Sequence, residues 1–342
     1  MHDAPSPGPL LFEPILKEKV WGGRRLETLG KALPAGARVG ESWELADLDA
    51  TSPTGGGGAA AHSVVRAGPM AGRSIRAVMD AWGAGLMGAA QPTPGGAFPL
   101  LIKFLDAAEN LSVQVHPSPA FAAAHADAHL KHEAWCVIAA APGSVIYRGL
   151  KPGVTRDEMA RRVREGTVVE ALRAVPATPG EILDLPSGVV HALGGGVLVA
   201  EVQTASDTTF RLDDWGRTGR ALHIEAALAS AFDGRGAQTV PAAALPPATR
   251  TRISTEAFTI TRIEIETGAS AAAHSGGASP SVVMLHGGAG DLRSTSGAFE
   301  PVPITIGDTA LVPAACRDSE LRARDACVFL RVTLPTVGED PH

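Results

Sequence analysis

Short apolar runs separated by glycine and proline dominate the hydrophobic pattern of the chain. Alternating or continuous apolar runs of this length predict β-strands. The clearest candidates are residues 40–45, 98–105, 113–116, 133–138, 181–185 and 197–203, and in the C-terminal part 258–265, 281–285, 303–313 and 326–332. The pattern therefore predicts a mainly β fold.

Helical signals are fewer and sit between the predicted strands. Ser118 and Pro119 have the residue types preferred at an N-cap and at the first helical position. Thr155 and Glu158 have the spacing of a capping box. The expected helices cover residues 74–87, an alanine-rich segment from 119 to about 129, and a helical insert over about 155–175 whose second helix lies at 168–175.

Charge and cysteine content narrow the class of protein. The 342 residues carry a formal net charge of -6, whereas a general nucleic-acid binder needs a basic surface. The three cysteines, Cys136, Cys316 and Cys327, form no disulfide framework. The N-terminus lacks the pattern of a signal peptide, and no apolar run approaches the length of a membrane span. We expect a cytoplasmic protein with no nucleic-acid and no membrane partner.

The segment 111–135 carries the first signal for a functional site. Gln114 and His116 lie two residues apart on a predicted strand, so their side chains face the same side. Glu133 begins the next predicted strand. An imidazole, a carboxamide and a carboxylate that converge in this way suit a divalent metal. The same three residues also fit a strand with a polar surface face, so this segment alone leaves both interpretations open.

A second segment strengthens the metal hypothesis. His191 follows a Pro-Ser-Gly turn and precedes three glycines and a strong predicted strand. A histidine placed in this way suits a ligand at the mouth of a β-barrel. A structural zinc is more often held by cysteines, and no cysteine here has ligand spacing. The sequence therefore predicts a catalytic metal site with the ligands Gln114, His116, Glu133 and His191.

The sequence allows two interpretations for Lys103 and two for a cluster of charged residues. Lys103 lies inside the apolar run 98–105, where its ammonium either reaches the edge of the sheet or points into a polar site. A dense charged cluster follows the predicted strand 197–203 and is either a solvated face or part of a polar site. Its members are Asp207, Arg211, Asp213, Asp214 and Arg217.

Six motifs occur in a fixed order along the chain: WGG at 21–23, GESW at 40–43, LSVQVHP at 111–117, KHEAW at 131–135, PSGVVHAL at 186–193 and EVQTASDTTFRLDDWGR at 201–217. Together they resemble the type I mannose-6-phosphate isomerases, in particular the short bacterial branch of that family. The resemblance implies a cupin (jelly-roll) β-barrel, one zinc ion (Zn2+) per chain and a small-molecule sugar phosphate as substrate. The implied reaction interconverts mannose 6-phosphate and fructose 6-phosphate.

The resemblance also implies roles for individual residues. The zinc ligands would be His116, Glu133, His191 and, as the fourth, Gln114; the catalytic residues would be Arg211, Lys131 and Asp207. One position departs from the longer members of the family, which carry a histidine where this chain has Leu130. His132 is one position away from Lys131 and would face the other side of a strand.

The implied chemistry moves a proton between C1 and C2 of the sugar through a cis-enediol. A metal near the sugar oxygens would stabilise the developing negative charge. Lys131 is a candidate base, and Arg211 a candidate for holding the oxyanion. The phosphate needs cations at the far end of the pocket, and the sequence does not choose among Lys17, Lys19, Lys103 and Arg217.

The C-terminal part is expected to form a second β unit. A Gly-Asp-Thr phrase ending at Pro313 echoes the Pro-Gly-Glu phrase ending at Pro186, which suggests two related cupin-like units. We therefore expect a catalytic domain at 1–240 with the helical insert, a linker at 240–248 and a cupin-like domain at 249–342 without a metal. A monomer or weak homodimer is expected.

Two other functions suit a cupin scaffold. An oxygenase would hold iron in a His/carboxylate triad, but it has no need of the Lys-x-Glu and Asp-x-x-Phe-Arg motifs. A non-catalytic sugar-phosphate-binding regulator would be expected to lose the ligands or Arg211, and these residues are intact. A metal analysis separates the first alternative from the isomerase.

Overall fold

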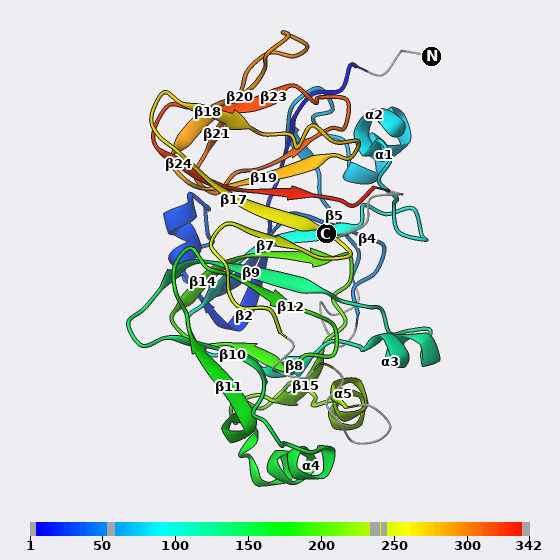
Figure 1. Ribbon diagram of the computed structural model, residues 1–342, viewed down its shortest axis with the longest axis vertical. Helices are drawn as coiled ribbons and strands as arrows, with labels where there is room; N and C mark the ends of the chain where they lie inside the picture. Colours follow the sequence, from blue (N-terminus) through cyan, green and yellow to red (C-terminus); the bar gives the residue numbers. More distant parts are fainter. Residues whose placement is uncertain (1–4, 53–58, 233–239, 241–244, 337–342) are drawn as a thin grey trace.

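The computed structural model describes residues 5–52, 59–232, 240 and 245–336, and antiparallel β-sheets make up most of it (Figure 1). The mainly β fold class is confirmed. The C-terminal strands lie at one end of the long axis and helix α4 (Arg156–Glu165) at the other, with the central sheets between them (Figure 1). No helix in the described ranges is long and apolar enough to cross a membrane.

Two facing sheets form the central part of the molecule. The larger has six strands in the order β12 (Ile182–Leu185), β9 (Glu133–Ala140), β14 (Val197–Thr204), β7 (Leu100–Ala107), β3 (Val39–Leu45) and β2 (Ile15–Gly23). The smaller has the order β11 (Leu172–Pro176), β10 (Val145–Leu150), β13 (His191–Leu193), β8 (Val113–Val115) and β15 (Phe210–Asp213). Trp135 and Val199 of the larger sheet pack with Ile146 and Leu193 of the smaller one. Apolar side chains at alternate strand positions thus fill the space between the two facing sheets.

A second pair of sheets forms the C-terminal part. The larger has the order β16 (Arg252–Ser254), β17 (Thr259–Ile265), β24 (Cys327–Thr333), β19 (Ser281–Gly287), β22 (Thr309–Val312), β1 (Leu10–Phe12) and β6 (Val65–Ala67). The smaller has the order β18 (Ser270–Ala272), β23 (Ser319–Ala323), β20 (Ala289–Ser294) and β21 (Val302–Thr305). Buried side chains such as Val283, Leu292, Leu321 and Phe329 pack together here. Strands β1 and β6 from the start of the chain therefore complete a sheet of the C-terminal part.

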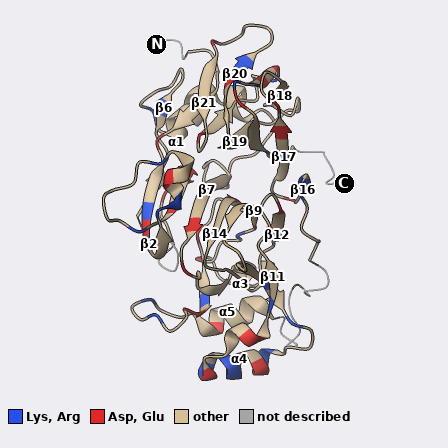
Figure 2. Cartoon of the chain, turned by 90° about the vertical axis from the view of Figure 1, so that its left-hand side faces the viewer, with Lys and Arg blue, Asp and Glu red and all other residues tan. Residues whose placement is uncertain are grey.

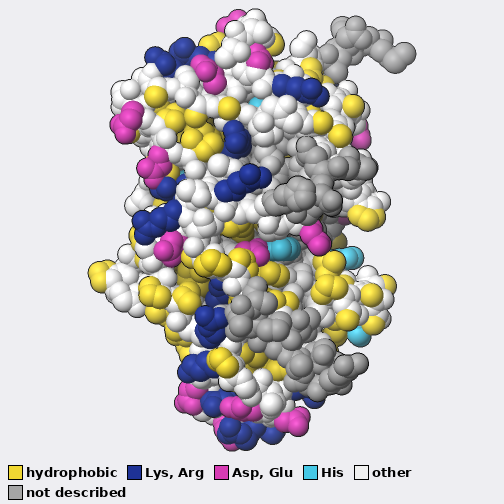
Figure 3. All heavy atoms as spheres, viewed as in Figure 1, with side chains coloured by type: hydrophobic (Ala, Val, Ile, Leu, Met, Phe, Trp, Pro, Cys, Tyr) yellow, Lys and Arg dark blue, Asp and Glu magenta, His cyan; other side chains and the backbone are white. Residues whose placement is uncertain are grey.

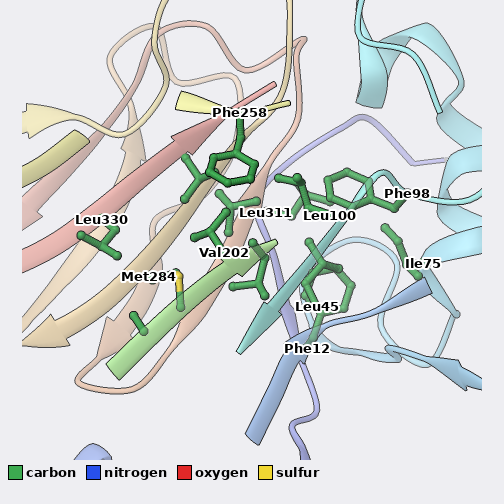
Figure 4. Close-up of a cluster of buried hydrophobic side chains, with 14 of the residues drawn as sticks. Phe12, Leu45, Ile75, Phe98, Leu100, Val202, Phe258, Met284, Leu311 and Leu330 are labelled. Carbon is green, nitrogen blue, oxygen red and sulfur yellow. The ribbon is translucent and has the colours of Figure 1, made fainter. Parts of the chain in front are cut away.

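One hydrophobic cluster joins the two parts. Phe258, Met284 and Leu330 of the C-terminal part belong to the same buried cluster as Leu100 and Val202 of the central sheet (Figure 4). Burial of such side chains stabilises each by about 1.5–3 kcal/mol relative to exposure, so this contact contributes substantially to the fold. The predicted linker at 240–248 lies mostly outside the described residues, and the division into domains 1–240 and 249–342 stays a prediction.

The helices differ in extent from those expected. The single helix predicted at 74–87 is two helices, α1 (Ile75–Trp82) and α2 (Ala84–Met87), separated at Gly83, whose φ of 46° does not continue an α-helix. The alanine-rich helix α3 (Pro119–Ala124) ends well before 129. Its predicted start is confirmed, since the Ser118 hydroxyl accepts a hydrogen bond from the Phe121 amide at 3.2 Å.

The helical insert is partly as predicted. Helix α4 begins at the Thr155 cap, whose hydroxyl accepts a hydrogen bond from the Glu158 amide. The predicted second helix at 168–175 is wrong: a 3-10 turn, η2 (Val168–Ala171), passes directly into strand β11. Pairing of β11 with β10 overrides the local helical signal. The insert forms a tip that carries both basic and acidic residues (Figures 2 and 3), including the pair between Arg162 and Glu158 at 2.9 Å.

Candidate metal centre and active site

Three buried side chains from the two central sheets converge between those sheets. His116 follows β8, His191 begins β13 and Glu133 begins β9. Each is fully buried, and their ligand atoms all lie within 4.8 Å of one another. Nε2 of His116 lies 3.2 Å from Oε2 of Glu133, and Nε2 of His191 lies 3.0 Å from Oε1. We refer to these three residues as the triad.

Backbone carbonyls fix both imidazole rings. Nδ1 of His116 lies 2.9 Å from the Thr208 carbonyl oxygen, and Nδ1 of His191 lies 2.9 Å from that of Val189. A carbonyl oxygen can only accept, so each Nδ1 carries the proton and donates it. Each Nε2 then presents a lone pair towards Glu133, which is the arrangement common to metal-binding histidines.

The triad has the properties of a cation site. In the described part of the chain, Nε2 of His116 and Oε1 of Glu133 are buried without a hydrogen-bond partner, which is costly unless a cation binds them. Burial, together with the charge of Lys131, lowers the pKa of His116 to about 3. Burial raises the pKa of Glu133, but Lys131 and His116 outweigh this effect and lower it well below its usual value. A neutral imidazole and an ionised carboxylate are the forms that bind metals.

Gln114 lies beside the triad. It is the register partner of His191 on one side and of Arg211 on the other, so the three residues form a row across β13, β8 and β15. Its Nε2 lies 3.2 Å from Nε2 of His191, and its Oε1 accepts a hydrogen bond from Ser112 at 3.4 Å. The expectation that Gln114 and His116 face the same side agrees with these contacts.

A pocket opens next to the triad, and we refer to it as the central pocket. It is lined by Lys19, Trp21, Glu41, Trp43, Lys103, Leu105, Leu111, Ser112, Gln114, Lys131, Glu201, Asp207, Thr209, Arg211 and Arg220. Gln114 and Lys131 separate it from the triad: the Lys131 ammonium lies 2.8 Å from Oε2 of Glu133. The pocket therefore combines charged walls with a candidate cation site behind them.

The three residues expected to act in catalysis all line this pocket. Lys131, Asp207 and Arg211 are each less than a tenth exposed. Asp207 accepts a hydrogen bond from the Ser52 amide at 2.6 Å, and Nη1 of Arg211 donates to the Ala221 carbonyl at 3.0 Å. Burial lowers the pKa of Arg211, and the neighbouring charge of Arg220 adds to this effect. The charged cluster after β14 thus contributes to a polar site as well as to the surface.

Lys103 points into the polar site, which decides between the two interpretations left open by the sequence. Its ammonium lies 3.1 Å from Glu201 and 3.8 Å from Glu41. Burial lowers the pKa of Lys103, but the carboxylates of Glu201 and Glu41 outweigh burial and raise it. Glu41 also accepts a hydrogen bond from the Trp43 indole at 2.6 Å. Burial raises the pKa of Glu41, yet Lys19 and Lys103 dominate and bring it down to about 2.

Sequence reasoning missed Glu41, Glu201 and Arg220 as pocket residues. Glu41 and Trp43 lie two residues apart on a predicted strand, so the alternation alone could have assigned them to one face. Of the cations considered for a phosphate, Lys19 and Lys103 line the central pocket, whereas Lys17 lies over the Trp43 ring. Arg217 lies beside a separate surface hollow with Glu109 and Asn110.

His132 faces away from the central pocket. Its Nε2 lies 2.6 Å from Oδ1 of Asp184, and its ring meets the edge of Phe258. The alternation between Lys131 and His132 therefore sends their side chains to opposite sides, as predicted. In the described residues of the C-terminal part, no group of three His, Cys, Asp or Glu side chains has the spacing of the triad.

Comparison with known proteins agrees with this geometry. Residues 10–135 match the family model for the catalytic domain of phosphomannose isomerase type I. Mannose-6-phosphate isomerase ManA of Bacillus subtilis (strain 168) is 36% identical over 227 residues, which are 64% of this chain and 66%, just under two thirds, of that protein. Mannose-6-phosphate isomerase of Streptococcus mutans is 34% identical over 241 residues, which are 68% of this chain and 71% of that protein.

Solved structures extend the likeness over nearly the whole chain. The crystal structure of the mannose 6-phosphate isomerase from Bacillus subtilis matches with a TM-score of 0.74 and 25% identity, over 95% of this chain and 99% of that chain. The cupin fold expected from the motifs is thereby confirmed. With the family model, the curated relatives and the fold in agreement, the chain belongs to the type I mannose-6-phosphate isomerases.

Proposed function

We propose that this chain is a zinc-dependent aldose–ketose isomerase that interconverts mannose 6-phosphate and fructose 6-phosphate by proton transfer between C1 and C2. The observation that carries the proposal is the triad, in which Nε2 of His116 and Oε1 of Glu133 are buried without a hydrogen-bond partner beside a pocket lined by charged side chains. The names of the relatives identify mannose 6-phosphate as their substrate, which supports the same substrate here.

His116, Glu133 and His191 would hold the metal, one ion per chain. Two imidazole nitrogens and a carboxylate oxygen are a donor set typical of catalytic zinc. The Gln114 amide would supply a fourth ligand through Oε1, which a flip of the amide turns towards the triad without a change of shape. When bound, zinc supplies a Lewis acid that polarises the carbonyl of the substrate.

Lys131 is the residue that we assign to the proton transfer. Its Nζ lies beside the triad and lines the pocket, so it can reach a carbon held next to the metal. In its neutral form it takes the proton from C2 of the aldose as O1 gains a proton to give the cis-enediol, and it returns the carbon-bound proton to C1 as O2 loses its hydroxyl proton and becomes the ketone oxygen. A single base on one face of the planar enediol is sufficient for the transfer between the two carbons.

Arg211 and Asp207 would orient the sugar. The Ala221 carbonyl holds the Arg211 guanidinium at the pocket wall, where it can stabilise an oxyanion on C1 or C2. The Asp207 carboxylate, held by the Ser52 amide, can accept a hydrogen bond from a sugar hydroxyl. The apolar side chains of Trp21, Leu105 and Leu111 reduce access of water to the reacting carbons.

The first experiment is a coupled assay of mannose 6-phosphate conversion. Metal-free protein is compared with protein given zinc or iron, and Arg211→Ala is tested alongside with its bound metal measured by elemental analysis. We expect zinc to restore activity and Arg211→Ala to lose it while keeping the metal. Turnover or ligand binding that depends on iron, without isomerisation in zinc, would contradict the proposal and favour an oxygenase.

The route of the hydrogen is tested separately in deuterated water. Proton transfer through Lys131 allows exchange with solvent, so fructose 6-phosphate should acquire deuterium at C1. A product without deuterium would indicate a hydride shift instead, with the isomerase assignment intact.

Location and assembly stay predictions. We expect a cytoplasmic enzyme, without nucleic-acid or membrane partners, that is a monomer or a weak homodimer. Light scattering over a range of protein concentrations measures the oligomeric state directly.

A further inference from the structure

A second cavity lies at the edge of the paired central sheets that is opposite to the central pocket. The central pocket draws on β2 and β15, which are edge strands of their sheets. The second cavity draws on the other two edge strands, β11 and β12, together with β10 and the segment 245–248. Its volume of about 490 Å³ is within the range that holds a small molecule. We refer to it as the edge cavity.

Arg148 on β10 lies at one end of the row that carries a triad histidine. It is the register partner of His191, and His191 pairs in turn with Gln114. Gln114 pairs with Arg211 on its other side. The row therefore has an arginine at each end, with Arg211 at the central pocket and Arg148 at the edge cavity. The two cavities thus lie on opposite sides of His191.

The Arg148 guanidinium is buried and only partly satisfied. Its Nε donates to the Asp184 carbonyl at 2.8 Å, and its Nη1 donates to the Pro246 carbonyl at 2.7 Å. Nη2 is buried without a hydrogen-bond partner in the described part of the chain. A buried charged donor in this state is unfavourable and needs an acceptor. Since Arg148 lines the edge cavity, an anion bound there can supply that acceptor.

Three arginines and two carboxylates surround the edge cavity. Arg148, Arg173 and Glu181 line it, and Arg250 lies 4.0 Å from Glu181. Burial lowers the pKa of Arg148, the charge of Asp184 opposes this effect, and the charge of Arg173 adds to it. An arginine keeps its charge under such shifts. These groups therefore leave one net positive charge at the cavity.

Neighbouring charges do not reverse this balance. Arg262, next to Gly180, is paired with Glu264. His132 lies 2.6 Å from Asp184 and adds a positive charge only when it is protonated. A site with a single positive charge is complementary to a monoanion rather than to a phosphate dianion.

Most of the remaining wall is apolar. Val175 and Leu183 face the buried cluster between the two sheets. The segment 245–248 supplies further apolar side chains. Its neighbour Thr249 is held to Ile182 by two backbone hydrogen bonds of 2.6 and 3.1 Å, so this wall is attached to β12. A bound molecule would meet cationic groups at one end and hydrocarbon along its body.

We propose that the edge cavity binds a small monocarboxylic acid with an apolar body, such as a short-chain fatty acid. The carboxylate would bind Arg148 and Arg173, because the planar guanidinium matches the two oxygens of a carboxylate. The hydrocarbon would contact Val175, Leu183 and the segment 245–248. The edge cavity shares no described lining residue with the central pocket, so this proposal is independent of the isomerase reaction.

The test measures binding of hexanoate to the metal-loaded full chain by calorimetry, with 1-hexanol as the neutral compound of equal length. Hexanoate should bind at least about 10-fold more tightly than 1-hexanol, since a hydrogen bond to a charged group is lost in the alcohol. Arg148→Gln should weaken hexanoate binding by about 10- to 100-fold for the same reason. Arg211→Gln in the central pocket is the matched control and should leave the affinity unchanged.

Two further variants guard against a folding defect from the loss of buried Arg148. Arg173→Gln removes an exposed arginine of the cavity and should also weaken hexanoate binding. Ala248→Trp should abolish binding by filling the cavity while both arginines remain. The melting temperature of each variant is measured alongside. If Arg148→Gln does not fold, these two variants decide the question.

Several results would overturn the proposal. They are absence of hexanoate binding by the wild type, equal affinities for hexanoate and 1-hexanol, and a loss in Arg211→Gln that matches the loss in Arg148→Gln. Hexyl phosphate, a dianion with the same apolar body, would overturn the monocarboxylate assignment if its binding depended on Arg148 more strongly than that of hexanoate. Isomerase activity is not a readout of this test, so failure of the proposed function would leave its outcome unaffected.

Discussion

The Lys103 ammonium on β7 lies 3.1 Å from the Glu201 carboxylate on β14, and the two residues are direct partners in the register of the central sheet. The same row continues to Trp135 on β9 and to Trp43 on β3. The Trp135 indole donates to Glu201 at 2.7 Å. A buried ion pair thus forms part of the pocket wall and is held between two aromatic side chains.

Lys103→Met should destabilise the protein strongly. The substitution leaves Glu201 and Glu41 buried without their shared cation, a change that costs about 3–5 kcal/mol. The free energy of unfolding is measured in urea with metal-free protein, so that metal binding does not contribute. Arg161→Met on α4 is the control, because its exposed pair with Glu165 is worth only about 0.3–0.5 kcal/mol. Equal stabilities of the two variants would contradict the prediction.

Glu41 should make the stability depend on pH below about 4.5. Its pKa falls from an ordinary value of 4.5 to about 2 in the folded protein, so the unfolded chain binds the proton first. The contribution of Glu41 is complete above pH 4.5 and is lost as the pH falls towards 2. Since a shift of one pKa unit corresponds to about 1.36 kcal/mol, the lowered pKa of Glu41 contributes roughly 3 kcal/mol to the free energy of unfolding.

This pH dependence is measured as the difference in unfolding free energy between wild type and Glu41→Gln at pH 7, 4 and 3. The difference should shrink progressively over this range. A difference that stays constant from pH 7 to pH 3 would show that Glu41 does not have the lowered pKa.

His116→Ala should abolish stoichiometric binding of the metal. The substitution removes one of the two imidazole ligands of the triad and leaves a carboxylate and a single histidine. His132→Ala is the control, since His132 pairs with Asp184 on the opposite side. Elemental analysis after dialysis against zinc should find about one ion per chain in the control, in keeping with one mononuclear catalytic site per chain. Loss of metal from both variants, or from neither, would contradict the assignment of the ligands.

Gly307→Ala should be far more destabilising than Gly297→Ala. Both glycines have a positive φ, 86° and 78°, so an added Cβ meets similar backbone strain, roughly 1–2 kcal/mol. At Gly307 the new Cβ would also lie 1.8 Å from the Leu29 carbonyl oxygen, whereas nothing lies within 4 Å at Gly297. The difference between their melting temperatures reports the cost of this clash, which arises because the turn between β21 and β22 lies close to the end of η1 (Arg25–Leu29). Similar melting temperatures would show that the turn can move away.

The strands of the central sheets could be predicted because their signals are local. Alternation places Gln114 and His116 on one side and separates Lys131 from His132, and both relationships need only the period of two. The start of α3 is equally local, because Ser118 and its neighbours satisfy the first amides of the helix. The end of α3 was misjudged because alanine favours a helix without specifying where it ends.

Some residues of the site could not be predicted from the sequence, because the order of the strands in the sheet brings them together. Glu41 and Glu201 meet around Lys103 only because β3 and β14 flank β7 from distant parts of the chain. Residues 168–175 have helical propensity, yet β10 offers Val175 and its neighbours a partner strand. Arg220 lies in a segment without periodicity, and its place in the pocket depends on contacts of Trp215 and Asp214.

The position of β1 between β22 and β6 has a consequence for biosynthesis. Leu10 emerges from the ribosome early, but its partner Leu311 is made only after about nine tenths of the chain. Pairings across such a separation form slowly, because a long loop must close before the contact is gained. We infer that the seven-stranded sheet is completed only once β22 has been made, and that until then β1 has one unpaired strand edge.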